Sequence, residues 1–269
     1  MNISQTLIRY IEALGGIFVK MFHGLPKTIQ QFGFFIVFIG QALAEPIKRK
    51  IRWTNMMMQM KSIGVSSLFI VGLTGIFTGM VMALQTGRAF SQFQAETLTG
   101  AVCALSIWKE LGPVLATLMI TARSGSAMAA QLGTMQVSQQ IDALVSMAVN
   151  PMGYLVAPRI IACVVVTPIL TAMFDFMGMI GSYLVGVYLL KIDAATFVEK
   201  IVFYTTTGDL IEGLFKSAIF AFILSSISCY KGFFTKGGAE GVGRSTTQAV
   251  VLSSVSILVF DYFLTALLF

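Results

Sequence analysis

Charged residues are scarce in this chain, and the side chains that build most catalytic or metal sites are few and scattered. Asp, Glu, Lys and Arg make up 11% of the 269 residues, against 56% hydrophobic residues. Soluble domains carry about 25% charged residues, so this composition excludes an ordinary soluble domain and indicates an integral membrane protein. A single histidine, His23, provides no basis for a Ser/His/Asp triad or a histidine metal site.

The cysteines are equally sparse. Cys103, Cys163 and Cys229 stand alone in apolar stretches without metal-ligand spacing, so we interpret them as packing residues and expect no disulfide framework. The basic residues, which give a pI near 9.3, cluster at the ends of apolar runs as the positive-inside rule predicts, not over a polar face that would suit nucleic acid. We also expect no cleaved signal peptide, because no short apolar core precedes a small-residue cleavage site.

The first 52 residues form the expected N-terminal membrane element. Apolar residues spaced three to four apart in 1–27 predict an amphipathic helix lying in the membrane interface. Residues 28–44 are uncharged but have basic residues on both sides, which favours an interfacial or re-entrant segment, with a true span as the alternative. Residues 53–269 are expected to form one transmembrane domain.

Five long apolar segments predict an all-α membrane protein with five transmembrane helices. The spans are expected at 62–87, 97–131, 155–190, 213–230 and 245–268. The polar residues 191–212 between the third and fourth spans predict an outer-side loop or short helix. With a cytoplasmic N-terminus, the outer segments hold only Arg88, Lys191 and Lys200 among the basic residues, whereas the inner ones hold most of the rest. This asymmetry predicts the orientation, with the C-terminus outside.

Six ionisable residues fall inside the predicted spans. An unpaired charge at this depth costs at least about 2.5 to 3.5 kcal/mol, so these side chains should pair, face the bundle interior or face water. Two interpretations stay open: fixed ion pairs that hold the helices in register, or pairs that break and re-form as the protein changes state. The six are Lys109, Glu110, Arg123, Asp175, Lys216 and Asp261.

Two inner segments carry further signals. Residues 238–245 (GAEGVGRS) have the spacing of a phosphate-binding loop but lack the preceding strand, so we interpret them as a flexible hinge before the last span. Residues 137–149 predict a short amphipathic helix, capped by Ser138 and ended by Asn150-Pro151. Its apolar stripe suits either the membrane surface or a groove on a partner protein.

Several spaced motifs resemble one permease family. They are ELGPV at 110–114, ARSGSAMAAQLGTM at 122–135, QQIDAL at 139–144, MAVNP at 147–151, PR at 158–159 and FDYFLTALLF at 260–269. In this order they are similar to the MlaE (YrbE) family of ABC-transporter permeases, the membrane subunits of phospholipid-trafficking systems associated with MCE-domain proteins. The resemblance covers roughly residues 50–269.

The resemblance implies a non-catalytic permease subunit in the inner (cytoplasmic) membrane. It implies a homodimer with two cytoplasmic ABC ATPase subunits that bind ATP and Mg, an MCE-protein oligomer on the outer side and, as a further candidate, a small STAS-type subunit. No cofactor is expected in this chain itself. Two other classes stay open: a proton-coupled lipid carrier using Glu110, Asp175 or Asp261, and a structural membrane scaffold for MCE proteins.

The resemblance also implies roles for individual residues. The helix between the second and third spans is the expected coupling helix to the ATPase, with contacts from Val137, Gln139, Gln140, Ile141, Asp142, Leu144 and Val145. Acidic residues are usual in the family at positions 139, 145 and 150, but here only Asp142 is acidic, which favours apolar coupling contacts. Glu110, Lys216 and Asp261 match charged positions within the family's spans, and we expect them to form an internal charge network tied to the conformational cycle. The expected lipid pocket is formed by Met82, Ala89, Phe90 and Phe93, whose alternative role is contact with bulk lipid or other helices.

Overall fold

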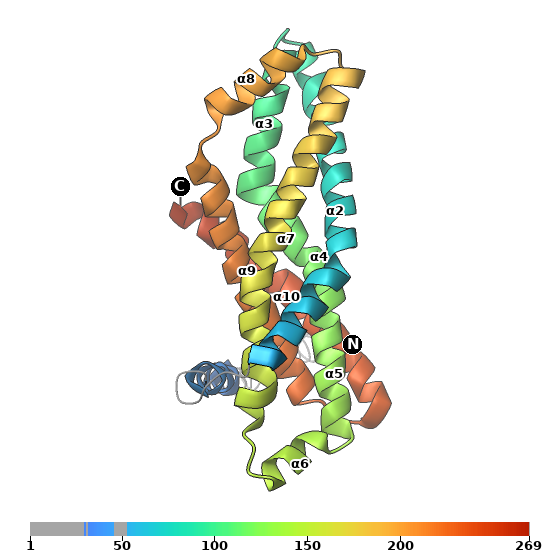
Figure 1. Ribbon diagram of the computed structural model, residues 1–269, viewed down its shortest axis with the longest axis vertical. Coiled ribbons are helices and arrows are strands. Elements are labelled where there is room, and N and C mark those ends of the chain that lie inside the picture. The colour runs from blue at the N-terminus through green and yellow to red at the C-terminus, as the bar shows by residue number, and fades with distance from the viewer. Residues whose placement is uncertain (1–29, 31, 46–52, 269) are drawn as a thin grey trace, which may run out of the picture.

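The computed structural model describes residue 30, residues 32–45 and residues 53–268, and over these ranges the chain is helical with no strand. Figure 1 shows an elongated bundle with helices along its long axis and shorter helices at both ends. Five helical segments are long and apolar enough to cross a membrane: Trp53–Ser91, Glu96–Val137, Met152–Leu189, Thr207–Phe233 and Gly238–Leu267. The predicted fold class, five transmembrane helices preceded by a shorter apolar one, is therefore confirmed.

The first and third spans pack closely along a glycine seam. α2 (Trp53–Ser91) lies against α7 (Ala157–Tyr183). A side-chain carbon placed on Gly79 would clash with the carbonyl group of Gly178, and one on Gly181 would clash with that of Ile76. Backbones can approach this closely only where side chains are absent. The seam therefore fixes the register between these two helices.

The second span changes its helical pitch twice. It runs through η1 (Glu96–Leu98), α3 (Thr99–Ser106), η2 (Ile107–Leu111), α4 (Gly112–Ile120), η3 (Thr121–Gly125) and α5 (Ser126–Val137). Both η2 and η3 are π-helical turns, which insert an extra residue into the helix and occur frequently at functional sites. The first π turn contains Lys109 and Glu110, and the second contains Arg123.

The connection from the third span to the fourth is mostly helical. The third span begins with the π turn η4 (Met152–Val156) and ends with another, η5 (Leu184–Leu189). α8 (Ala194–Tyr204) follows, with Asp193 accepting a 2.9 Å hydrogen bond from the amide of Thr196. This bond stabilises the ionised carboxylate and so lowers the pKa of Asp193.

Two predicted boundaries were wrong. α9 (Thr207–Phe233) starts earlier than the expected fourth span, because Thr206 and Asp209 form a capping box that begins a helix within the polar segment. α10 (Gly238–Leu268) includes the whole of 238–245, so the predicted hinge is a helix. The glycines at 241 and 243 do not interrupt the helix, because the long apolar span that follows continues the same helix. Gly237 and Gly238, with φ of 96° and 67°, make the turn at which it begins.

The Phe32–Glu45 helix lies across the bundle rather than along it (Figure 1, lower left). Phe38 and Ala42 face the bundle and are almost completely buried, at 3% and 0% exposure. The ring of Phe38 lies 5.5 Å from that of Tyr230 in an edge-on contact. This placement agrees with an interfacial segment, whereas the amphipathic helix predicted over 1–27 lies outside the described residues.

Candidate functional site

An ion pair joins the second and fourth spans at the first π turn. The ammonium nitrogen of Lys216 on α9 lies 2.8 Å from Oε1 of Glu110. Lys216 is 2% exposed, so its charge is almost wholly removed from solvent and lipid. Thr265 on α10 accepts a 2.9 Å hydrogen bond from Lys216 and donates one of 3.2 Å to Glu110. Three of the five spans therefore meet at one charged group.

Asp261 belongs to the same cluster. It lies four residues before Thr265 on α10, which places both side chains on one face of the helix. Its carboxylate is close enough to interact electrostatically with both Glu110 and Lys216. The structure thus brings together the three charged residues that the family resemblance singled out. We call Glu110, Lys216, Asp261 and Thr265 the inner ion cluster.

The backbone carbonyl of Lys109, four residues before a proline, is a further hydrogen-bond acceptor for Lys216. In a regular helix the carbonyl of Lys109 would accept the amide hydrogen of residue 113, but Pro113 has no amide hydrogen. Lys216 donates instead to this carbonyl, at 3.2 Å. Its three N–H groups are therefore matched by Glu110, Thr265 and the Lys109 backbone. A buried charge tolerates this environment only when its donors are satisfied in this way.

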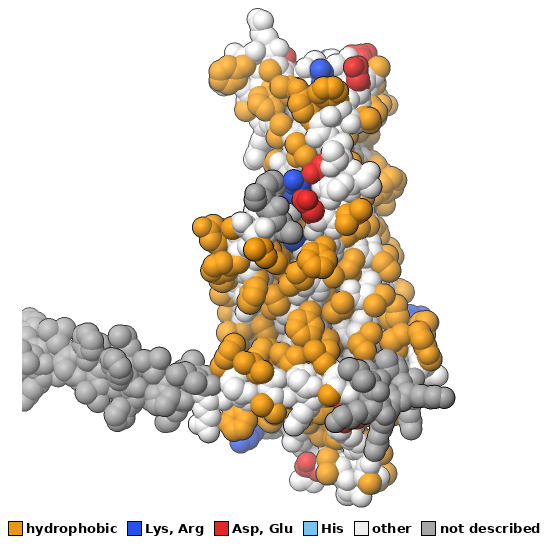
Figure 2. All heavy atoms as spheres, turned by 90° about the vertical axis from the view of Figure 1, so that its left-hand side faces the viewer, with side chains coloured by type: hydrophobic (Ala, Val, Ile, Leu, Met, Phe, Trp, Pro, Cys, Tyr) orange, Lys and Arg blue, Asp and Glu red, His pale blue; other side chains and the backbone are white. Residues whose placement is uncertain are grey.

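A second ion pair lies on the neighbouring side of the π turn. The Lys109 side chain lies 3.0 Å from Asp209 and 3.5 Å from Glu212, both on the first turns of α9. Figure 2, which views the side where α9 begins, shows acidic and basic side chains together within an otherwise hydrophobic surface. Adjacent residues 109 and 110 thus bind α9 through opposite charges.

Asp175 and Arg123 do not join these pairs. Asp175 is 2% exposed, and neither carboxylate oxygen has a hydrogen-bond partner in the part of the chain that the structure describes. It lies directly against Gly112, where any side-chain carbon would clash with its Oδ1. Arg123 is exposed on the second π turn, which suits the alternative that its side chain reaches toward the membrane surface.

The predicted lipid-pocket residues lie at the end of α2 that faces α8. Met82 and Ala89 are seven residues apart and share one face of the helix. Phe90 is half-buried and its carbonyl accepts hydrogen bonds from Phe93 and Ala95 in the turn that follows. Phe93 lies beyond the helix and is 76% exposed. Met82 is half-buried and Ala89 is exposed, so the four residues differ in how far they are covered.

The predicted coupling helix is shorter than expected. α6 spans Gln140–Ser146 at the opposite end of the bundle from α8 (Figure 1). Val137 belongs to the end of α5, and Ser138 donates its hydroxyl back to the Thr134 carbonyl, so its predicted N-cap role was wrong. Gln139, in the left-handed conformation with φ of 59°, makes the sharp turn between the two helices instead.

The apolar residues of α6 do not all face the same way: some pack against the bundle and one is exposed. Ile141 is 3% exposed and packs with Leu132, Leu155 and Ile160, with Leu144 partly buried beside it. Val145 is 58% exposed. Gln139, Gln140 and Asp142 are exposed as well. One side thus anchors α6 to the bundle, and the other leaves an apolar residue among polar ones at the surface.

The described residues include no group of three or more His, Cys, Asp or Glu side chains that could hold a metal ion. What they do contain is a helix that carries an ion cluster at one level and an exposed short helix at its end.

Comparison with known proteins decides the family. The model of the permease MlaE family matches residues 56–267. The chain belongs to the MlaE family of ABC-transporter permeases. A probable ABC transporter permease protein of Rickettsia typhi is 42% identical over 90% of this chain and 94% of its own length. The intermembrane phospholipid transport system permease protein MlaE of Haemophilus influenzae is 34% identical over 98% of each chain.

A plant relative extends the similarity beyond bacteria. The chloroplastic protein TRIGALACTOSYLDIACYLGLYCEROL 1 of Arabidopsis thaliana is 38% identical over 87% of this permease and 67% of its own length. The Phe32–Glu45 helix and residues 53–55 lie before the range of the family model. The permease is a multi-pass membrane protein by both its family and its five apolar helices.

The sequence did not point to three residues that the structure places at the ion pairs: Asp209, Glu212 and Thr265. Asp209 and Glu212 were assigned to a polar outer segment, because their charges interrupt the apolar run that defines the fourth span. Their spacing of three residues within a helix was the available signal, since it puts both on one face. Thr265 carries no charge and gave no signal in the sequence of this permease.

Proposed function

We propose that this chain is the membrane subunit of an ABC transporter that moves phospholipids between the inner membrane and an MCE-protein ring. The family membership and the names of its relatives support this function. The observation that carries it is that exposed α6 joins, through the turn at Gln139, the helical span that runs through α5, η3 and α4 to the inner ion cluster. Such a connection lets a cytoplasmic partner move the spans without any chemistry in this chain.

The partner is a cytoplasmic ABC ATPase, present in two copies and binding ATP and Mg. The exposed side of α6, with Val145 and the neighbouring Met147 at 58% and 64% exposure, docks into a groove of that subunit. Asp142 is the acidic residue of α6 and forms its charged contact. Because Ile141 anchors the helix to α5 and α7, movement of α6 is transmitted to the second and third spans.

The substrate pocket lies at the other end, around Met82, Ala89, Phe90 and Phe93. Large apolar and aromatic side chains suit acyl chains. Two copies of the chain related by a two-fold axis place two such surfaces around one cavity, which suits a two-tailed lipid. The MCE oligomer covers this end and exchanges lipid with the cavity, and a small STAS-type subunit is a further partner on the ATPase side.

The orientation follows the distribution of positive charge. The segments at the α6 end are rich in Lys and Arg, so this end is cytoplasmic, and the α8 end, with Lys191 and Lys200, is periplasmic. The N-terminus is accordingly inside and the C-terminus outside in the inner membrane. ATP binding and hydrolysis then shift α6, tilt the spans and compress the pocket.

Substitution of Val145 tests this function directly. Val145→Asp should abolish copurification of an ABC ATPase and ATP-dependent transfer of a fluorescent phospholipid from proteoliposomes. Phe203→Asp is the matched control, because Phe203 on α8 is also highly exposed (76%) but lies at the opposite end. The control should keep the ATPase. If Val145→Asp retains both ATPase and transfer, α6 is not the coupling helix.

Two other classes make opposite predictions in the same assay. A proton-coupled carrier would transfer lipid without ATP and lose activity with a protonophore. A structural scaffold would tolerate Phe90→Ala and Phe93→Ala with no loss of lipid movement. The transporter requires ATP, resists the protonophore and loses transfer with the two phenylalanine changes.

A further inference from the structure

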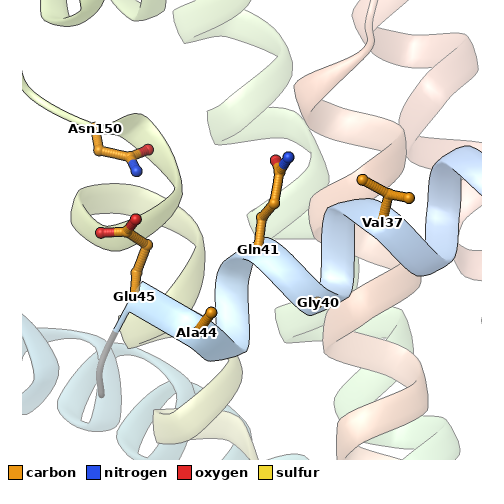
Figure 3. A pocket seen from close by; sticks show the side chains of 6 residues that line it. All are labelled: Val37, Gly40, Gln41, Ala44, Glu45 and Asn150. Atoms are coloured by element: carbon orange, nitrogen blue, oxygen red, sulfur yellow. The ribbon is translucent and has the colours of Figure 1, made fainter. Parts of the chain in front are cut away.

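A polar pocket lies where the Phe32–Glu45 helix meets the start of the third span. It has a volume of about 530 Å³ and is lined by Val37, Gly40, Gln41, Ala44, Glu45 and Asn150. Figure 3 shows the side chains of Glu45 and Asn150 pointing toward one another across it, with Gln41 one turn earlier on the same side of the helix. This volume is within the range of small-molecule sites.

The polar groups of this pocket have unused hydrogen-bonding capacity. Oδ1 of Asn150 accepts the amide hydrogen of Met152 at 3.0 Å, which directs its NH₂ group to other partners. The side chains of Glu45 and Gln41 form no hydrogen bond or ion pair within the ranges that the structure describes. The pocket therefore offers one carboxylate and two amide groups, and it can take a ligand with both an ammonium group and anionic oxygens.

The pocket continues into an apolar surface on the same helix. Phe34, Val37, Gln41 and Glu45 follow one another at three- and four-residue spacing, so they form one stripe. Phe34 and Val37 are 58% and 56% exposed at the apolar end of the stripe. Phe38 and Ala42 face the bundle, so within the described ranges of the chain the apolar end of this stripe stays largely exposed. A ligand that lies along it must be polar at one end and apolar at the other.

The position of the helix selects the type of amphiphile. The helix lies across the bundle at the same end as α6 (Figure 1), the level at which lipid headgroups meet the cytoplasm in the proposed orientation. We propose that Gln41, Glu45 and Asn150 bind the headgroup of an amine-bearing phospholipid from the inner leaflet. The ammonium group donates to Glu45, the amides of Gln41 and Asn150 donate to the phosphate, and an acyl chain lies over Val37 and Phe34.

This site is separate from the proposed transport pocket at the α8 end, and it does not depend on transport. The test uses the full-length protein in nanodiscs of equal phosphatidylethanolamine and phosphatidylglycerol, followed by native mass spectrometry of the retained lipid. Wild type should retain one more ethanolamine lipid per chain than Glu45→Gln. Loss of a charge-assisted hydrogen bond should lower the ratio of ethanolamine to glycerol lipid by about tenfold.

Controls separate this site from general effects. Glu240→Gln removes the same charge from an exposed position on the first turn of α10 and should leave the ratio unchanged. Gln41→Ala should lower the ratio in the same direction as Glu45→Gln. Phosphatidylcholine, whose trimethylated nitrogen has no hydrogen to donate, should be retained less than phosphatidylethanolamine by the wild type.

Three results would overturn the assignment. They are an unchanged ratio in Glu45→Gln, equal retention of choline and ethanolamine lipids, and a Glu45→Gln variant that loses a copurifying protein while keeping the lipid. The last result would show that the carboxylate binds a basic side chain of a protein partner. Activity of the transporter enters none of these readouts, so failure here leaves the proposed function untouched.

Discussion

The ammonium group of Lys216 lies 3.2 Å from the backbone carbonyl oxygen of Lys109, four residues before Pro113, which has no amide hydrogen to donate to it. The two residues belong to different spans, so the ammonium group of the fourth span donates a hydrogen bond to a carbonyl of the second span near its proline. The π turn at Ile107–Leu111 brings Glu110 to the same ammonium group. Any rotation of the second span must therefore change the hydrogen bonds of Lys216.

We predict that Lys216→Met destabilises the fold strongly. The substitution keeps the length of the side chain, but it leaves Glu110 without its counter-charge and removes the hydrogen bond from Lys216 to the Lys109 carbonyl. Removing one member of a buried ion pair costs about 3 to 5 kcal/mol, and because the Glu110 side chain is 34% exposed we expect about 2 to 3 kcal/mol. Thermal unfolding in detergent, followed by intrinsic fluorescence, measures the effect.

A double substitution is the control for this prediction. Glu110→Gln together with Lys216→Met removes both charges of the pair and should recover part of the loss, because the Glu110 carboxylate is no longer left without its counter-charge. Additive losses in the two single variants and the double variant would show that the pair contributes no coupling energy.

We predict a ranking within the second ion pair. Asp209→Asn should lower stability by about 1 kcal/mol and by more than Glu212→Gln, because Asp209 lies closer to Lys109 and is less exposed, at 12% against 40%. The side-chain oxygen of asparagine can still accept the hydrogen bond from the Thr206 amide, so this variant mainly removes the charge. The same unfolding assay compares the two, with Glu199→Gln on the exposed side of α8 as the reference. The reverse ranking would be inconsistent with the observed distances.

The sequence predicted the spans well because each is a long apolar run, but it could not assign the partners of the buried charges. Which of six charged residues meet depends on helix rotation, and the π turns at 107–111 and 121–125 change that rotation without any compositional signal. Capping explains another error: Thr206 and Asp209 begin a helix where polarity indicated a loop. Residues 238–245 were also misassigned, because the low helix propensity of single glycines is outweighed by the context of the long helix that contains them.

We predict that Asp175→Asn is tolerated. An ionised carboxylate without a partner at this depth is unfavourable, and the neutral amide has nearly the same shape. The change in unfolding free energy should stay within about 1 kcal/mol, and ATP-dependent lipid transfer should persist. Asp175→Ala should instead lower stability by leaving a cavity beside Gly112. Loss of transfer in a stable Asp175→Asn variant would favour the proton-coupled carrier, in which this carboxylate must gain and lose a proton.

The last prediction concerns the seam between α2 and α7. Gly79→Ala should destabilise the protein by about 1 to 3 kcal/mol, because its new carbon meets the backbone of Gly178 and the two helices must separate. Gly243→Ala is the matched control: Gly243 lies inside α10 with nothing within 4 Å of its missing side-chain carbon. There the same substitution should raise stability by up to about 1 kcal/mol through helix propensity. Equal melting temperatures for the two variants would mean that the first and third spans adjust freely, and that their close approach does not fix the register of the bundle.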